Sequence, residues 1–152
     1  MVVFVKDPDP LEDMKTLLSE HWKSYKQSKI PQILVANAAD DPRIRADLSM
    51  GDVIVIKQDG LEKLTQRYNF SYYDRLFPIV IEIYTKDSRQ RMRDLGKMVR
   101  VVINDNIHFF PTYQLMRYKG YSEEVGDTLN IWRGKFRFQL ESNAICVESL
   151  EH

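Results

Sequence analysis

Apolar residues recur at intervals of three and four near the start of the chain, which is the spacing of an amphipathic helix. Asp9-Pro10 stands before this stretch, a capping residue followed by a proline that the first turn of a helix tolerates. Lysines gather before Pro31, where the helix would end. The pattern predicts a helix from about residue 10 to residue 28. Its apolar stripe is Leu11, Met14, Leu18, Trp22 and Tyr25.

Short runs of β-branched residues follow this helix. Residues 33–36 form an apolar run that would suit a short strand, and residues 37–48 have the turn chemistry and weak periodicity of a long connection. Residues 53–56 are a second apolar run, bounded by the turn dipeptide Asp59-Gly60. We therefore expect a strand that ends in a turn at residues 59 and 60.

Alternation with a period of two marks the next two strands. Apolar and polar residues alternate over 64–72, and Phe77 to Thr85 places every second apolar side chain on one face. Asp74-Arg75 is expected to close the hairpin between them. Pro78 indicates that the second strand begins at a sheet edge or a bulge, because proline cannot donate to a ladder.

A second helix is predicted to start at the segment Asp87 to Gln90 and to end near Asn104 to Asn106. In its capping arrangement the Asp87 side chain would accept from first-turn amides, and the Gln90 side chain would reach back to the cap. Gly96 lies on or near its packed side, where it would let the helix approach a sheet closely. The apolar stripe of this helix is Met92, Leu95, Val99, Val102 and Ile103.

The last third of the chain predicts a second hairpin. Its strands are Tyr113 to Tyr121 and Trp132 to Glu141, separated by the acidic, glycine-containing loop Ser122 to Asp127, and a last short strand could follow at Ala144 to Glu148. The segment 132–141 has the clearest alternation in the chain, so one of its faces should be core and the other outward.

The expected fold class is α+β, with a single antiparallel or mixed β-sheet, two main helices packed on it and the order α-β-β-β-α-β-β. Residues 1–149 are expected to form one domain, and residues 150–152 look like the remnant of an expression tag. No internal repeat and no shift of composition marks a second domain.

Composition narrows the function classes. The chain has 152 residues, of which 43% are hydrophobic and 29% charged, as in globular proteins. Basic and acidic residues number 22 each, so no overall positive charge draws the chain to nucleic acid or anionic lipid. Cys146 is the only cysteine, which excludes an internal disulfide and fits a reducing compartment. The apolar runs are too short for a membrane helix.

None of the usual catalytic patterns occurs in the sequence. His21 and His108 lack companions at metal-ligand spacing, and Cys146 has no histidine near it in sequence. The six glycines are scattered singly rather than grouped in a phosphate-binding loop. We therefore expect no enzyme activity, no cofactor, no metal and no small-molecule substrate.

Two segments are candidate binding surfaces. The first is an aromatic hairpin, a candidate protein interface because tyrosines bury large areas and keep a polar group; its residues are Tyr68, Phe70, Tyr72, Tyr73 and Arg75. The second is the basic outer face of the last strand, Arg133, Lys135 and Arg137, together with the arginines of the second helix. A solvated face or ion pairs between subunits explains such a cluster more readily than phosphate binding in a chain of zero net charge.

The arrangement of elements resembles the small tail-terminator and tail-completion proteins of long-tailed bacteriophages and of related archaeal viruses or proviruses. The similar stretches are residues 75–84 leading into residues 87–104, and the amphipathic closing strand Gly134 to Leu140. The likeness runs from about residue 10 to residue 142, in order of elements and size rather than in a diagnostic motif.

This resemblance implies an assembly role and transfers no catalytic residues. The expected partners are further copies of the chain, in a ring such as a hexamer, and the tail-tube and head-connector proteins. The expected location is the host cytoplasm during assembly and then the virion tail. DNA contact would be weak. Two other hypotheses remain open: a nucleic-acid-binding module that uses the basic strand face, and an enzyme subunit whose site a partner completes.

Overall fold

The computed structural model describes residues 9–22, 30–35, 51–66, 72–106, 113–125 and 131–146, with the backbone alone for 64–66, 72–74, 113–116, 125 and 142–146. In these ranges the elements are α1 (Pro10–His21), β1 (Gln32–Val35), β2 (Val53–Gln58), β3 (Lys63–Gln66), β4 (Tyr72–Thr85), α3 (Arg89–Asn106), β5 (Tyr113–Val125) and β6 (Trp132–Cys146). No helix in this part of the chain is long and apolar enough to cross a membrane.

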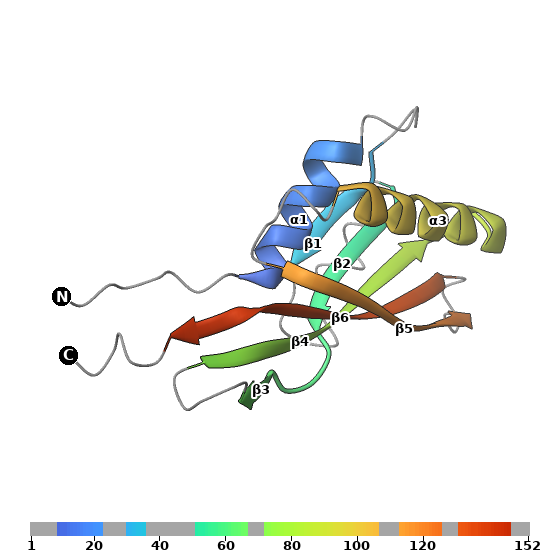
Figure 1. Cartoon of the computed structure of the whole chain (residues 1–152). Coiled ribbons are helices and arrows are strands. Elements are labelled where there is room, and N and C mark those ends of the chain that lie inside the picture. Colours follow the sequence, from blue (N-terminus) through green and yellow to red (C-terminus); the bar gives the residue numbers. More distant parts are fainter. Residues whose placement is uncertain are drawn as a thin grey trace.

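The strands form one mixed sheet in the order β1-β2-β4-β6-β5, with both helices on the same face (Figure 1). β1 runs parallel to β2, and the other pairings are antiparallel. When β2 and β3 are taken as one interrupted strand, the order of elements is α-β-β-β-α-β-β. The predicted fold class is therefore confirmed, and the sheet is mixed.

β2 and β3 lie one after the other along the same edge of β4. Gln58 pairs with Ile79 and Lys63 with Leu76, so residues 59–62 stand opposite only two residues of β4. β2 ends at Gln58, directly before the turn expected at residues 59 and 60, and the extra residues form a bulge. Gly60 has a φ of +103°, a conformation that other residues rarely adopt.

Pro78 lies in β4 opposite this bulge. The amide of Asp59 donates to the carbonyl of Pro78 at 3.0 Å. In an antiparallel strand the amide and carbonyl positions of one residue point to the same neighbour, so the missing N–H of Pro78 faces the interrupted edge and costs no ladder bond to β6. Pro78 thus lies opposite a bulge, as expected, although β4 begins at Tyr72 and not near Pro78.

The first hairpin differs from the prediction. Asp74 and Arg75 pair with Thr65 and Leu64 inside the β3–β4 ladder, and Tyr72 already belongs to β4. The turn prediction at Asp74-Arg75 was wrong because backbone pairing to β3 on one side and β6 on the other outweighs the local turn preference of aspartate. The residues between Gln66 and Tyr72 lie outside the described residues.

The second hairpin is longer than predicted. Ser122 to Val125 continue β5 instead of forming a loop, and Ala144 to Cys146 continue β6 instead of forming a separate strand. Glutamates are poor strand formers, but both glutamates of this segment are bound by cations of neighbouring elements. The rest of the predicted loop and the residues after Cys146 lie outside the described residues.

The helix starts follow from their capping residues. The Asp9 side chain accepts from the amide of Glu12 at 3.3 Å, as predicted. For α3 the cap is Ser88, whose hydroxyl accepts from the amide of Arg91 at 3.0 Å, and not Asp87. Ser88 directly precedes the first helical residue, so Asp87 lies one position too early to cap it. Gln90 donates to Asp94 rather than reaching back.

The end of the first helix is only partly described. α1 ends at His21, and the predicted continuation to residue 28, including Tyr25, lies outside the described residues. Met14, Leu18 and Trp22 of the predicted stripe are fully buried.

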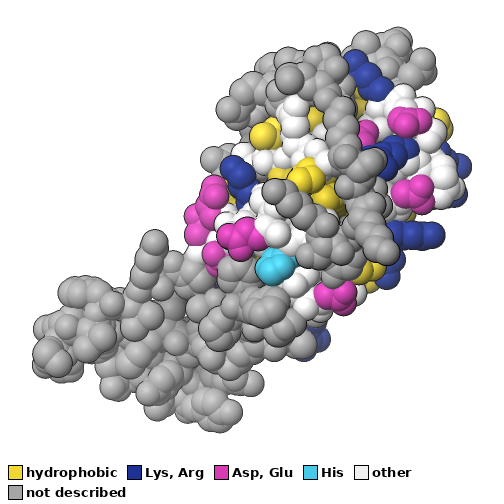
Figure 2. Space-filling model, turned by 90° about the horizontal axis from the view of Figure 1, so that it is seen from above, with side chains coloured by type: hydrophobic (Ala, Val, Ile, Leu, Met, Phe, Trp, Pro, Cys, Tyr) yellow, Lys and Arg dark blue, Asp and Glu magenta, His cyan; other side chains and the backbone are white. Residues whose placement is uncertain are grey.

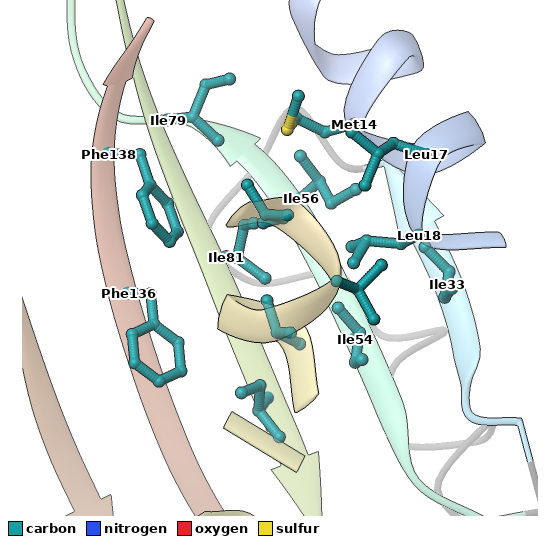
Figure 3. Close-up of a cluster of buried hydrophobic side chains, with 14 of the residues drawn as sticks. Met14, Leu17, Leu18, Ile33, Ile54, Ile56, Ile79, Ile81, Phe136 and Phe138 are labelled. Carbon is teal, nitrogen blue, oxygen red and sulfur yellow. The ribbon is translucent and has the colours of Figure 1, made fainter. Parts of the chain in front are cut away.

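The core lies between the helices and the sheet (Figure 3). Side chains of β2, β4 and β6 that point to the helix-bearing face meet the apolar stripes of both helices, as the two periodicities predict. The sheet contributes Ile54, Ile56, Ile79, Ile81, Ile83, Phe136, Phe138 and Leu140. The helices contribute Met14, Leu17, Leu18, Met92, Leu95, Val99, Val102 and Ile103.

Gly96 lets α3 lie close to the sheet. A Cβ atom added there would lie 2.8 Å from two ring carbons of Phe136. That ring is stacked on Tyr121 with their centroids 4.5 Å apart, which limits its movement. The missing side chain therefore sets the height of α3 above β6.

We predict that Gly96→Ala destabilises the fold by about 1–3 kcal/mol, because overpacking against Phe136 outweighs the helix-propensity gain of about 1 kcal/mol. Urea denaturation measures the change. Asn104→Ala, at an exposed position of the same helix, is the matched control and should be neutral or slightly stabilising. Phe136→Leu in the Gly96→Ala background should recover part of the loss, and additive effects of the two changes would contradict this account.

Candidate functional site

The alternation of β6 assigns its side chains to two faces. Trp132, Phe136, Phe138 and Leu140 point to the helices, and Arg133, Lys135 and Arg137 point to the opposite face, here called the far face. The predicted division of this strand into a core face and an outward face is confirmed. The predicted basic residues therefore share one surface, but the arginines of α3 lie on the other side of the sheet.

A buried carboxylate organises the far face. Glu82 on β4 is 3% exposed and accepts from Lys57 of β2 at 3.0 Å and from Arg133 of β6 at 3.2 Å. Tyr84 also donates its hydroxyl to Glu82. Lys57 is itself only 5% exposed. One carboxylate thus ties three neighbouring strands together.

Burial alone would raise the pKa of Glu82, because it disfavours the charged form. Hydrogen bonds from Tyr84 and Lys57 and the charge of Arg133 outweigh that effect, and the pKa of Glu82 lies below its ordinary value. For Tyr84, burial and the nearby carboxylate raise the pKa of the phenol. Glu82 is therefore ionised and bound, which suits a structural anchor rather than a general acid.

The cations of the far face are paired within the chain. Arg133 and Lys135 both lie 3.5 Å from Glu124 of β5, and Arg137 lies 3.3 Å from Asp59 in the bulge. Arg133 also lies over the ring of Tyr84, with its guanidinium carbon 5.5 Å from the ring centroid. The basic strand face expected from the sequence is thus a network of alternating charges.

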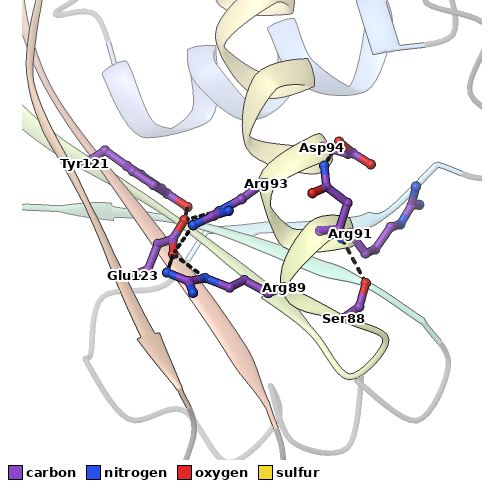
Figure 4. A network of polar contacts seen from close by, with 8 residues as sticks. Ser88, Arg89, Arg91, Arg93, Asp94, Tyr121 and Glu123 are labelled. Atoms are coloured by element: carbon purple, nitrogen blue, oxygen red, sulfur yellow. Dashed lines mark hydrogen bonds and ion pairs between the residues drawn. The ribbon is translucent and has the colours of Figure 1, made fainter.

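A second network joins α3 to β5 on the helix-bearing face (Figure 4). Glu123 accepts from Arg89 at 2.9 Å, from Arg93 at 2.9 Å and from the hydroxyl of Tyr121 at 2.8 Å. The hydrogen bond from Arg93 is the largest of the effects that lower the pKa of Glu123 to about 2. This clamp fixes the first turns of α3 against the sheet edge.

Two tyrosines of β5 lie beside α3. Tyr118 is 47% exposed and lies edge-on to Phe138, with centroids 5.8 Å apart, and Arg100 lies over its ring at 5.1 Å. Tyr121 is 38% exposed and stacks on Phe136. We call the set Arg89, Arg93, Lys97, Arg100, Tyr118 and Tyr121 the α3–β5 surface.

The sequence does not predict that Tyr118 and Tyr121 lie on the same face of β5. Residues 118 and 121 are three apart, so a regular strand would place them on opposite faces. The register of β5 shifts between Tyr118 and Gly120, where Lys119 is the extra residue, and the shift brings both rings to the helix-bearing face. The sign of this bulge in the sequence is the glycine at position 120, which has a φ of +152° in the structure.

The structure describes only part of the predicted aromatic interface. Tyr68 and Phe70 lie outside the described residues, and Tyr72 and Tyr73 are described only as backbone positions of β4. Arg75 is 8% exposed, bonded to Glu62 and placed over the ring of Phe77 at 5.5 Å. Its role in the structure is to hold the β2–β3 bulge against β4.

Acid, cysteine and histidine side chains do not gather into a metal-binding group anywhere in the described ranges. His21 lies half-buried on α1, and His108 lies outside those ranges. Cys146 is described only as the last backbone position of β6.

Comparison with known proteins finds likeness among solved structures and not among sequences. No protein-family model and no curated protein matches the sequence. Among solved structures, the fold resembles a chain of a particle described as "Virion of native gene transfer agent (GTA) particle". The TM-score is 0.47 and the identity 8%, over 83% of this chain and 94% of that one. Likeness at this level leaves the function to be argued from the residues themselves.

We predict that Glu82→Gln destabilises the fold by about 3–5 kcal/mol, because it removes the negative charge that faces two cations in a buried site. Glu124→Gln removes a carboxylate that is half exposed and should cost less than about 1 kcal/mol. Chemical denaturation of both variants at neutral pH measures the difference. Equal losses of stability in the two variants would show that the buried Glu82 contributes no more than an exposed carboxylate.

The Glu123 clamp predicts a pH dependence. Its lowered pKa means that the folded state favours the carboxylate, so the clamp stabilises fully above about pH 4.5 and is lost as pH falls toward 2. Glu123→Gln should lower stability by about 1–2 kcal/mol at pH 7 and flatten its fall between pH 4.5 and 2. Urea titrations across that range measure it. Glu141→Gln, which removes a surface partner of Arg117, is the control and should leave the slope unchanged.

Proposed function

We propose that this chain is a structural subunit that assembles with copies of itself, in the specific role of a phage-type tail terminator or tail-completion protein. The subunits would form a closed ring at the junction of head and tail, with the tail tube and the head connector as partners. Assembly would take place in the host cytoplasm, and the finished ring would belong to the virion.

The observation that carries this proposal is the order of elements. The resemblance to tail-terminator proteins rests on a helix, strands, a central strand leading into a second helix, and a closing hairpin. The chain has this order, with β4 leading directly into α3 and β5–β6 closing the sheet. The corrected turn and the longer strands change the boundaries of the elements and leave their order intact.

The use of charge supports a structural role over the two alternatives. A phosphate-binding face needs cations that are available to a ligand, but Arg133, Lys135 and Arg137 are each paired with a carboxylate of a neighbouring element. An acid–base site needs a carboxylate poised to exchange a proton, but Glu82 and Glu123 are both held ionised by several donors. Both networks join elements of the fold to each other.

We predict that the purified chain forms a discrete, closed oligomer whose population rises with concentration. Size-exclusion chromatography with light scattering from low to high micromolar protein measures the mass, and negative-stain electron microscopy shows whether the particles are rings. A closed ring gives one mass at saturation, because heterologous contacts that close leave no free ends.

A strictly monomeric chain at high concentration would contradict self-assembly. An unbounded series of masses would contradict closure and point to filaments. Binding to double-stranded DNA that disappears on replacing Arg133, Lys135 and Arg137 with glutamine would favour the nucleic-acid alternative.

A further inference from the structure

The two helices carry opposite charge although the whole chain has none. α1 and its cap have four carboxylates, Asp9, Glu12, Asp13 and Glu20, against the single Lys15, a net charge of −3. The described part of α3 has five cations, Arg89, Arg91, Arg93, Lys97 and Arg100, against Asp94 and Asp105, a net charge of +3. The helix-bearing face of the molecule is therefore electrically polarised.

Figure 2 shows this face from above. Acidic side chains lie toward the left, near the cyan histidine that belongs to α1, and dark-blue side chains gather along the right, with fewer acidic ones among them. α1 packs on β1 and β2, whereas α3 packs on β4 and β6 with β5 beyond it. The acidic and basic surfaces thus lie on opposite sides of one layer.

The basic side also carries the apolar area that an interface requires. Tyr118 and Tyr121 expose large parts of their rings next to the arginines, and half-exposed tyrosines beside arginines are the composition of protein interfaces. Glu123 holds Arg89 and Arg93, so Lys97 and Arg100 are the exposed cations farthest from that clamp along the helix.

Side-chain contact suits this edge better than the addition of another strand. β5 is the outermost strand of the sheet, but its register shift at Lys119 places an extra residue and an exposed lysine on the edge. Bulges and lysines on edge strands are devices that prevent pairing with another chain. A partner would therefore dock on the α3–β5 surface rather than extend the sheet.

We infer that the acidic outer side of α1 in one copy docks on the α3–β5 surface of a second copy. The inference rests on the proposed self-assembly and names its contact. Two different surfaces on opposite sides of each subunit make a head-to-tail contact, which is the kind that generates rings. Lys97 and Arg100 would meet carboxylates of α1 and set the register of the contact, and the tyrosines would anchor it.

Charge exchange between two variants tests the contact. The first variant is Thr16→Lys, Ser19→Lys and Glu20→Lys, all at exposed positions, which changes the charge of α1 and its cap from −3 to +1. The second is Lys97→Glu and Arg100→Glu, which changes α3 from +3 to −1. Lysines near the end of α1 also favour its dipole, so the first variant should fold.

Each variant alone should be largely monomeric, with the subunit dissociation constant raised at least about tenfold, because each now opposes like charges. An equimolar mixture should associate again, because each contact then joins opposite charges. The α1 of the second variant (−3) meets the α3 of the first (+3), and the α1 of the first (+1) meets the α3 of the second (−1). Light scattering measures both states, and rising salt should weaken the wild-type assembly. Lys63→Glu with Lys86→Glu, exposed and outside both surfaces, is the matched control and should assemble as wild type.

The outcomes separate this contact from the proposed function. If the wild-type chain assembles and both variants assemble equally well, the contact is wrong and self-assembly stands. If each variant is monomeric and the equimolar mixture is monomeric too, α1 of one copy does not dock on the α3–β5 surface of another, and the contact is again wrong. A monomeric wild-type chain would overturn both proposals. Loss of DNA binding in the second variant, with unchanged assembly, would assign the α3–β5 surface to nucleic acid.

Discussion

The pairing of β6 with β5 on one side, from Trp132 to Ser142, and with β4 on the other is the constraint on which the rest of the structure depends. A strand paired on both sides cannot slip by one residue without exchanging its two faces. Its phenylalanines must then meet the helices and its basic residues must face the other way. Gly96 in α3 completes this arrangement, because it is the point at which the helix can lie directly on Phe136. The two ion-pair networks occupy the two faces that this alternation defines.

Features that depend on local periodicity could be predicted from the sequence, and features that depend on distant partners could not. The alternation of β6 and the stripe of α3 are visible in single segments, and so is the position of Pro78 at an irregularity. The turn predicted at Asp74-Arg75 is wrong because both residues pair with β3 and Arg75 also pairs with β6. The acidic segment at residues 122–125 has the composition of a loop, and the arginines that bind Glu123 in the strand lie 30 and 34 residues earlier in the chain, out of reach of a local pattern.

The candidate surfaces follow the same rule. The basic residues of β6 can be found from the sequence, but their carboxylate partners in the bulge, on β4 and on β5 cannot. The sequence therefore suggests a basic face where the structure has a network of ion pairs. The arginines of α3 were grouped with them by composition, and the sheet separates the two sets. The net charge of zero does not reveal that one helix of the layer is acidic and the other basic, because a sum over the chain says nothing about where the charges lie.

The interrupted edge of β4 has a consequence for local stability. Pro78 has no amide hydrogen, and the bulge at residues 59–62 lies opposite it, so the ladder along this edge of β4 is interrupted between the β2 and β3 segments. The half beneath the helices, where β2 meets β4, is sealed by the core, whereas the β3–β4 half is joined to it by β4 and β6 alone. We therefore expect amide hydrogens on the two sides of this interruption to exchange independently, with the short β3 ladder opening while the helix-covered part of the sheet stays closed.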